Sequence, residues 1–137
     1  MPTNISQNQP SSNLILRIFQ LFVFIILLLM VVVQFNDPDP LFWIAFYGAC
    51  ALVPVFSFLK LNNKPLFYAC LVFGVIALFI SYEGALEYTN HYKDESLLQS
   101  MSADKPYLEE TREFFGVVIA LALITAHQFI LSRQPAQ

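Results

Sequence analysis

The stretch LILRIFQLFVFIILLLMVVVQFNDPDPLFW, residues 14–43, decides the fold of this chain. It opens with an apolar run, Leu14 to Phe35, in which Arg17 is the one charged residue. The turn-forming residues Asn36 to Pro40 follow, and a second apolar run extends from Leu41 to Leu59. A bilayer core about 30 Å thick is crossed by roughly 20 helical residues, so each run is long enough to span it. The stretch therefore predicts two membrane helices joined by a short turn.

The composition places the rest of the chain in the membrane as well. Hydrophobic residues make up 57% of the sequence and charged residues 12%, with a mean hydropathy of +0.59. This is too apolar for a soluble domain of the same length. Two further apolar runs, 65–82 and 114–131, contain no Asp, Glu, Lys or Arg. The predicted fold is all-α: a polytopic membrane protein with four transmembrane helices in an antiparallel bundle.

We expect one domain flanked by short tails. Residues 14–131 form the four-helix transmembrane domain, with spans at about 14–35, 41–59, 65–82 and 114–131 and an outer loop over 83–113. Residues 1–13 have no apolar periodicity and are expected to be a disordered N-terminal tail, and residues 132–137 a C-terminal tail. The first run is not interpreted as a cleaved signal peptide, because it is longer than a signal core and no pair of small residues follows it.

The charges predict an orientation. An even number of spans puts both chain ends and the loop 60–64 on one side of the membrane. That side carries four bases and no acid: Arg17, Lys60, Lys64 and Arg133. The other side carries all ten acids with three bases. Basic residues in short loops favour the cytoplasm and acids count for little, so we expect both termini in the cytoplasm, in the inner (plasma) membrane of a bacterium.

The turn between the first two spans has two interpretations. Asn36 suits the end of a helix, and Asp39 stands before a proline as an N-cap does. Trp43 is expected where aromatic rings anchor at the membrane interface. Gln34 and Asp37 are not needed to make a turn, and both would lie at the outer mouth of the bundle. The turn is therefore either a connection only or one half of a site.

The outer segment is rich in acids. Glu83, Glu87 and His91 recur every four residues and share a face if the third helix continues beyond the membrane. Further acids stand in the first turns of a helix that Pro106 can open: Glu109, Glu110 and Glu113. Carboxylates with one imidazole suit a hard divalent cation such as calcium, magnesium or manganese, or with His91 zinc, and the candidate ligands are Asp37, Glu83, Glu87, His91 and Glu113. Solvated charge is the alternative interpretation, since no spacing matches a defined metal-binding loop.

Arg112 immediately precedes Glu113 and the last apolar run. A charge at the edge of the hydrocarbon is costly without a partner, so we expect a carboxylate beside it. The candidates are Asp37, Asp39, Glu83 and Glu87. A bidentate bond from Arg112 to an acid of the turn would tie the first turn to the last helix.

Two short motifs carry a family resemblance. The first is QFNDPD at residues 34–39 with Trp43 four residues further on, and the second is EETREFFG at residues 109–116. In these motifs and in the order of its spans the chain resembles the transmembrane protein 220 family, small helical membrane proteins of animals and bacteria. The resemblance covers roughly residues 34–131. It implies that the outer turn and the start of the last helix belong to one shared outer site, and it implies no reaction.

Several function classes lack the residues they need. Cys50 and Cys70 are expected at different depths and form no C-x-x-C motif, so a thiol oxidoreductase is not predicted. No acid lies within a span, as proton-coupled export would require. His127, alone in the last span, is expected to bond a neighbouring helix or to lie at the interface. A net charge of −3 gives no nucleic-acid footprint.

We interpret the chain as a non-enzymatic binding or scaffold protein with a polar, acidic cluster on its extracytoplasmic face. The expected cluster comprises Gln34, Asn36, Asp37, Asp39, Trp43, Glu83, Glu87, Glu109, Glu110, Arg112 and Glu113. The alternative hypothesis is a metal-dependent membrane enzyme that uses the outer carboxylates and His91. No cofactor is expected beyond a divalent cation. The expected contacts are the lipid bilayer and a membrane-protein partner or a second copy of the chain.

Overall fold

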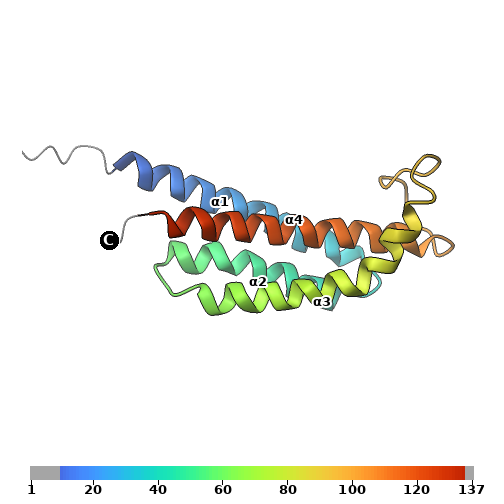
Figure 1. Cartoon of the computed structure of the whole chain (residues 1–137), viewed down its shortest axis with the longest axis horizontal. Coiled ribbons are helices and arrows are strands. Elements are labelled where there is room, and N and C mark those ends of the chain that lie inside the picture. Colours follow the sequence, from blue (N-terminus) through green and yellow to red (C-terminus); the bar gives the residue numbers. More distant parts are fainter. Residues whose placement is uncertain (1–9, 135–137) are drawn as a thin grey trace, which may run out of the picture.

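The computed structural model describes residues 10–134, and residues 1–9 and 135–137 lie outside the described part. The described residues form four α-helices and one short 3-10 helix: α1 (Pro10–Val33), η1 (Gln34–Asn36), α2 (Pro40–Phe58), α3 (Lys64–Tyr88) and α4 (Pro106–Ser132). No strand occurs among them. Successive helices run in alternating directions along one long axis (Figure 1). The predicted all-helical fold with four membrane helices is confirmed.

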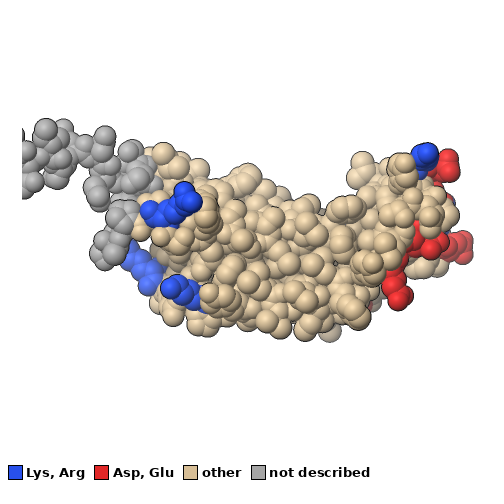
Figure 2. Space-filling view, viewed as in Figure 1, with Lys and Arg blue, Asp and Glu red and all other residues tan. Residues whose placement is uncertain are grey.

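The outer faces of the bundle are suited to lipid. All four α-helices are long and apolar enough to cross a membrane. Large apolar side chains point outward, and Phe79 and Leu41 are 84% and 82% exposed. Figure 2 shows a broad uncharged belt between two charged ends. Acyl chains solvate such a belt well, whereas soluble proteins rarely expose one, so the chain is an integral membrane protein.

One helix boundary differs from the expected spans, and another is as expected. The third span was expected to end at residue 82, but α3 continues to Tyr88, whereas α4 begins at Pro106, the residue expected to open it. The expected loop 83–113 therefore shortens to residues 89–105, because strong helix formers extend α3 and a proline opens α4 at its first turn. Residues 10–13, expected in the N-terminal tail, belong to α1, and the rest of that tail lies outside the described residues.

Aromatic side chains of α2 form the centre of the core. Trp43, Phe46 and Tyr47 are buried against residues of the other helices: Val23, Leu27, Ala77, Val117, Ala120 and Ile124. The most extensive helix contact joins α3 to α4. There, a methyl group added at Gly74 would lie 2.6 Å from the side chain of Leu121, so the two helices approach closely. Small residues drive helix packing in this way inside membranes.

The two ends of the bundle carry opposite charge (Figure 2). We call one the acidic end; it comprises the 36–40 turn, the last turns of α3, the α3–α4 loop (residues 89–105) and the first turns of α4. We call the other the basic end, which carries Arg17, Lys60, Lys64 and Arg133. At the basic end the Asn63 amide donates to Gln128 Oε1 at 2.9 Å, which joins the start of α3 to α4.

Candidate functional site

A cavity of about 310 Å³ opens at the acidic end between α1, α2 and α4. Its lining comprises Met30, Val33, Gln34, Asp37, Tyr47, Met101, Glu109, Arg112, Glu113 and Gly116. The turn after α1 and the start of α4, far apart in the sequence, thus contribute polar side chains to one concave surface. Concave sites with a few converging polar groups are the usual places of ligand binding.

The turn residues are positioned by the way α1 ends. The 3-10 helix η1 extends α1 by three residues, and the Asp37 amide donates to the Gln34 carbonyl at 3.1 Å. Asp37 is then extended before Pro38, and Asp39 occupies the N-cap position of α2. The side chain of Asp39 makes no capping bond, contrary to the role expected for it. Its carboxylate instead lies close to Glu109 and Glu113 of α4.

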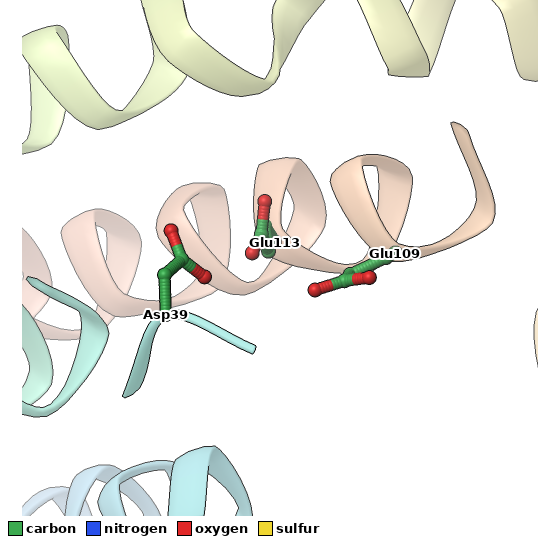
Figure 3. Close-up of side chains that lie close together, drawn as sticks. All are labelled: Asp39, Glu109 and Glu113. Atoms are coloured by element: carbon green, nitrogen blue, oxygen red, sulfur yellow. The ribbon is translucent and has the colours of Figure 1, made fainter. Parts of the chain in front are cut away.

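Three carboxylates converge beside this cavity: Glu109 and Glu113 belong to its lining, and Asp39 lies close to them but outside it. Figure 3 shows Asp39 pointing from the start of α2 toward α4, where Glu109 and Glu113 stand one turn apart. One oxygen from each residue lies within 4.8 Å of the other two. Asp39 is exposed and both glutamates are half-buried. We call these three residues the carboxylate cluster.

The electrostatics of the cavity disfavour negative charge. Burial raises the pKa of Asp37 above its usual value, and the neighbouring Asp39 raises it further. Arg112 lowers the pKa of Asp37, but its effect is smaller than those of burial and of Asp39. Like charges held together in a partly desolvated place destabilise one another. A cation would relieve this repulsion.

Arg112 does not pair as predicted. Its Nε donates to the carbonyl of Leu97 at 2.5 Å, and Nη2 donates to the carbonyl of Gln99. Among the described residues no carboxylate forms an ion pair with Arg112. The guanidinium presents donors in a planar fork, and two neighbouring backbone carbonyls accept from that fork in place of the expected carboxylate. Arg112 therefore fastens the α3–α4 loop to α4 over the cavity.

Neutral groups complete the cavity. Gln34 Oε1 is buried and has no hydrogen-bond partner within residues 10–134. Tyr47 reaches the cavity beside Gly116, where an added methyl group would overlap its hydroxyl. Trp43 stacks on Tyr47 with ring centroids 6.2 Å apart and is fully buried, so it packs in the core and does not face lipid as an interfacial anchor would. Sequence reasoning missed Tyr47, although it stands one helical turn after Trp43.

The other predicted residues lie outside the cavity. Asn36, Glu83 and Glu87 are exposed. Glu110 packs on Gly84, where an added methyl group would overlap its side chain. His91 lies 3.4 Å from Glu87 and stacks on Tyr107 with ring centroids 5.0 Å apart. The metal set drawn from the sequence is therefore divided: Asp37 and Glu113 line the cavity, whereas Glu83, Glu87 and His91 do not.

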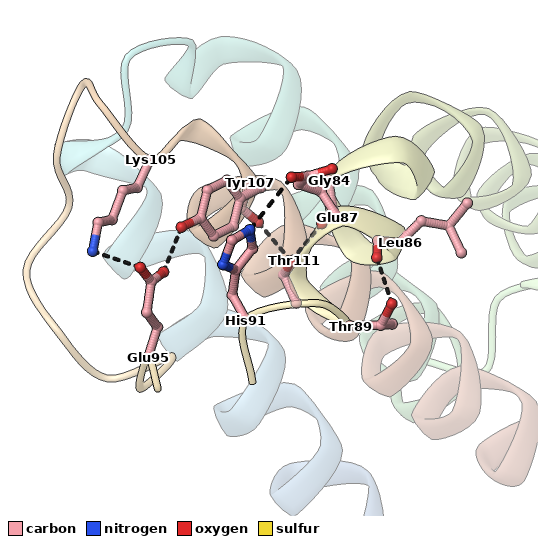
Figure 4. A network of polar contacts seen from close by, with 9 residues as sticks. All are labelled: Gly84, Leu86, Glu87, Thr89, His91, Glu95, Lys105, Tyr107 and Thr111. Atoms are coloured by element: carbon pink, nitrogen blue, oxygen red, sulfur yellow. Dashed lines mark hydrogen bonds and ion pairs between the residues drawn. The ribbon is translucent and has the colours of Figure 1, made fainter. Parts of the chain in front are cut away.

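A second polar network holds the α3–α4 loop (Figure 4). Glu95 accepts hydrogen bonds from Lys105 at 2.7 Å and from the hydroxyl of Tyr107 at 2.5 Å. These bonds hold the pKa of Glu95 below its usual value. Thr111 donates to the carbonyl of Gly84 at 3.1 Å and so links α4 to α3. These bonds join the loop to α4 and α4 to α3, which indicates a structural role.

Two features of the core differ from expectation. The thiols of Cys50 and Cys70 are neighbours in the core, so the two residues lie at a similar depth rather than at the two depths expected. Both are free thiols and buried, which shields them from a water-soluble thiol partner. His127 is fully buried and stacks on Phe19 with ring centroids 6.5 Å apart. Neither of its ring nitrogens has a hydrogen-bond partner among the described residues, so the expected bond to another helix is not formed.

These features define a class: a four-helix integral membrane protein with a carboxylate-rich cavity at one end of its bundle. The model of a family described as "Transmembrane family 220, helix" matches residues 11–129. The chain belongs to this family, and the resemblance inferred from its two motifs is confirmed. No curated protein and no solved structure shows a significant similarity to the chain. Membership establishes a membrane protein and assigns no reaction.

Proposed function

We propose that this chain is a non-enzymatic binding protein whose cavity at the acidic end takes a hard divalent cation such as Ca²⁺. One observation carries the proposal: oxygens of Asp39, Glu109 and Glu113 lie within 4.8 Å of one another. Ca²⁺ binds oxygen at about 2.3 to 2.6 Å, so ligands on opposite sides of the ion stand up to about 5 Å apart. The spacing of the carboxylate cluster is that of atoms able to share one ion.

The neighbouring donors favour the same class of cation. Asp37 and the unpartnered Gln34 Oε1 line the cavity beside the carboxylate cluster and supply further oxygens. Ca²⁺ accepts six to eight oxygen ligands, both charged and neutral, in flexible geometry. Zn²⁺ prefers nitrogen and sulfur, and His91 is engaged with Glu87 and Tyr107. An oxygen-only site therefore suits Ca²⁺ or Mg²⁺ better than Zn²⁺.

The charge balance supplies the driving force. Arg112 is the one base in the lining, and its hydrogen bonds go to the loop carbonyls of Leu97 and Gln99. The carboxylates face one another without a charged hydrogen-bond donor among the described residues. Bringing them together costs free energy that a bound cation returns.

Calorimetric titration of the protein in mild detergent with CaCl₂ tests the proposal. The Glu109→Gln/Glu113→Gln variant should weaken binding at least about 100-fold, equivalent to about 2.7 kcal/mol. The matched control is Glu83→Gln/Glu87→Gln, which removes the same charge from exposed positions at the same end. It should change the affinity less than about threefold, as screened surface charges do. Equal losses in the two variants would mean general attraction to the acidic end and would refute the site.

The orientation is a further part of the proposal: both termini lie in the cytoplasm and the acidic end lies outside the plasma membrane. Arg17, Lys60, Lys64 and Arg133 at the basic end support it, because short basic segments are retained inside. An extracytoplasmic cavity would also meet the higher Ca²⁺ level for which weak carboxylate sites are suited.

An impermeant thiol reagent on intact cells tests the orientation. Single cysteines are introduced as Asn62→Cys at the basic end and Ser100→Cys at the acidic end, in a background in which Cys50 and Cys70 are replaced by Ala. Both introduced positions are exposed. Position 100 should react in intact cells, and position 62 only after the membrane is opened. The opposite pattern would reverse the assignment.

A further inference from the structure

A groove runs between α1 and α2 near the basic end, at the opposite end of the bundle from the carboxylate cluster. Its volume is about 310 Å³. Six of its lining residues are Arg17, Ile18, Leu21, Phe24, Val55 and Phe58. Ile18, Leu21 and Phe58 are each more than half exposed, so the groove opens on the lipid-facing surface of the bundle.

The floor of the groove is closed by a satisfied polar pair. Gln20 is only 5% exposed, and its amide donates to the hydroxyl of Ser57 at 2.9 Å. This bond ties α1 to α2 and engages the Gln20 amide nitrogen. Pro54 lies beside it within the continuous helix α2. The wall that faces the membrane is therefore almost wholly apolar.

Hydrocarbon is the material that fits this wall. Inside a bilayer no water is present to fill a groove, and an unfilled one forfeits the dispersion contacts of its lining. The volume is at the small end of ligand pockets and suits part of one acyl chain rather than a whole lipid. An acyl chain entering from the surrounding leaflet meets no polar group that it would leave unpaired.

Arg17 gives the groove a charged end. Its guanidinium lies 5.5 Å from the centre of the Phe58 ring, at the level where arginines reach toward lipid headgroups. Among the described residues no carboxylate pairs with Arg17, and all ten acids of the chain lie between Asp37 and Glu113. Guanidinium binds phosphate through two parallel hydrogen bonds, so an anionic headgroup complements this position.

We propose that the groove binds one acyl chain of an anionic glycerophospholipid whose phosphate is held by Arg17. The apolar wall selects the chain, and Arg17 selects the headgroup. The remaining bases of the basic end attract an anionic leaflet as well, each as strongly as a single Lys or Arg near a membrane surface usually does. This site is independent of the cavity at the acidic end.

Spin-labelled lipids test the proposal with the whole chain reconstituted in phosphatidylcholine vesicles. The probes are phosphatidylglycerol and phosphatidylcholine, each labelled deep in one acyl chain. Wild-type protein should immobilise a larger fraction of the phosphatidylglycerol probe than of the phosphatidylcholine probe. Equal fractions would overturn the proposal. Added inorganic phosphate should leave the preference intact, whereas loss of the preference would indicate a site for a free anion.

Two variants and one control separate the groove from general charge. Arg17→Gln should abolish the preference for phosphatidylglycerol. The control is Arg133→Gln, which removes the same charge from the same end. Arg133 also lies over a ring, Phe129 at 4.2 Å, but it does not line this groove. The control should keep the preference, and equal effects at Arg17 and Arg133 would overturn the site.

The second variant acts on the chain rather than the headgroup. Val55→Phe fills the groove while Arg17 remains, so it should reduce the immobilised fraction of both probes. Val55 is half-buried, and its replacement leaves the Gln20 to Ser57 bond in place. An unchanged immobilised fraction in this variant would show that lipid does not enter the groove.

Discussion

Replacing Arg112 by glutamine should release the α3–α4 loop without unfolding the bundle. Arg112 holds this loop through the carbonyls of Leu97 and Gln99, and the loop in turn places Met101 at the cavity. Glutamine keeps some of the side-chain volume but cannot reproduce the planar fork of donors. The four helices are packed through their own cores, so the damage should be local.

The size of the effect follows from the two hydrogen bonds lost. A hydrogen bond to a charged group contributes about 1.5 to 3 kcal/mol. Arg112 is half-buried, so the lower value applies to each bond, which gives about 3 kcal/mol for the pair. Since about 1.4 kcal/mol corresponds to a factor of ten, the open population of the loop should rise about 100-fold.

Hydrogen exchange read by mass spectrometry measures this opening. The Gln99 and Lys105 amides donate within the loop, so peptides covering residues 89–105 report its release. Exchange there should accelerate about 100-fold in Arg112→Gln, while peptides within α1 to α4 stay unchanged. Lys93→Gln, which removes a base from the same loop, is the matched control and should leave exchange as in the wild type.

One outcome would refute the reasoning and another would redirect it. If Arg112→Gln left loop exchange unchanged, the two carbonyl bonds would not hold the loop. If Arg112→Lys behaved as the wild type, charge rather than the fork of donors would be responsible. The structure also predicts that Arg112→Gln and Asp37→Asn are coupled by less than about 1 kcal/mol, since the two side chains interact without an ion pair.

Three further changes probe the acidic end. Because the pKa of Asp37 is raised in the folded protein, Asp37 stabilises the fold most in acid, and this stabilisation is lost as pH rises through the folded pKa. Asn stays neutral at every pH, so the melting temperature of Asp37→Asn should rise relative to that of the wild type between about pH 4 and pH 7. The lowered pKa of Glu95 has the opposite sign: Glu95→Gln should speed loop exchange at neutral pH, and the difference should vanish as pH falls below about 4. Gly116→Ala should lower the melting temperature and the free energy of unfolding, the latter by about 1 to 3 kcal/mol, because the added methyl group meets Tyr47. The control is Gly48→Ala, which should be neutral because the added group has no atom within 4 Å.

The spans could be predicted because bilayer thickness and proline chemistry act locally. A run without charge has few alternatives to a membrane helix, and Pro40 and Pro106 mark the first turns of α2 and α4. The sequence also predicted that Asp37 and Glu113 lie at the same end of the bundle. Two spans separate the turn from the start of the last helix, so the chain crosses the membrane and comes back between them. These predictions need no knowledge of how the helices rotate about their axes.

Helix rotation explains what the sequence missed. Trp43 was expected at the lipid interface but faces the core, because α2 turns its aromatic side chains toward the bundle. Glu83 and Glu87 point away from the cavity because Gly84 packs against Glu110 of α4. No local pattern encodes such rotations, which depend on the fit of small residues between helices. Backbone carbonyls as partners of Arg112 likewise leave no signal in the sequence.

The loop and the cavity share Arg112, so the cation binding proposed above would be linked to docking of the loop. A ligand that binds better when the loop is docked must stabilise the docked loop by the same free energy. If the cation is enclosed beneath Met101, saturating CaCl₂ should therefore slow exchange in residues 89–105 of the wild-type protein. The Glu109→Gln/Glu113→Gln variant should show no such slowing, because it lacks two of the three carboxylates that meet the ion. Slowing of equal size in that variant would mean that Ca²⁺ acts elsewhere on the acidic end, whereas unchanged exchange in a wild-type protein shown to bind Ca²⁺ would mean that the loop does not close over the ion.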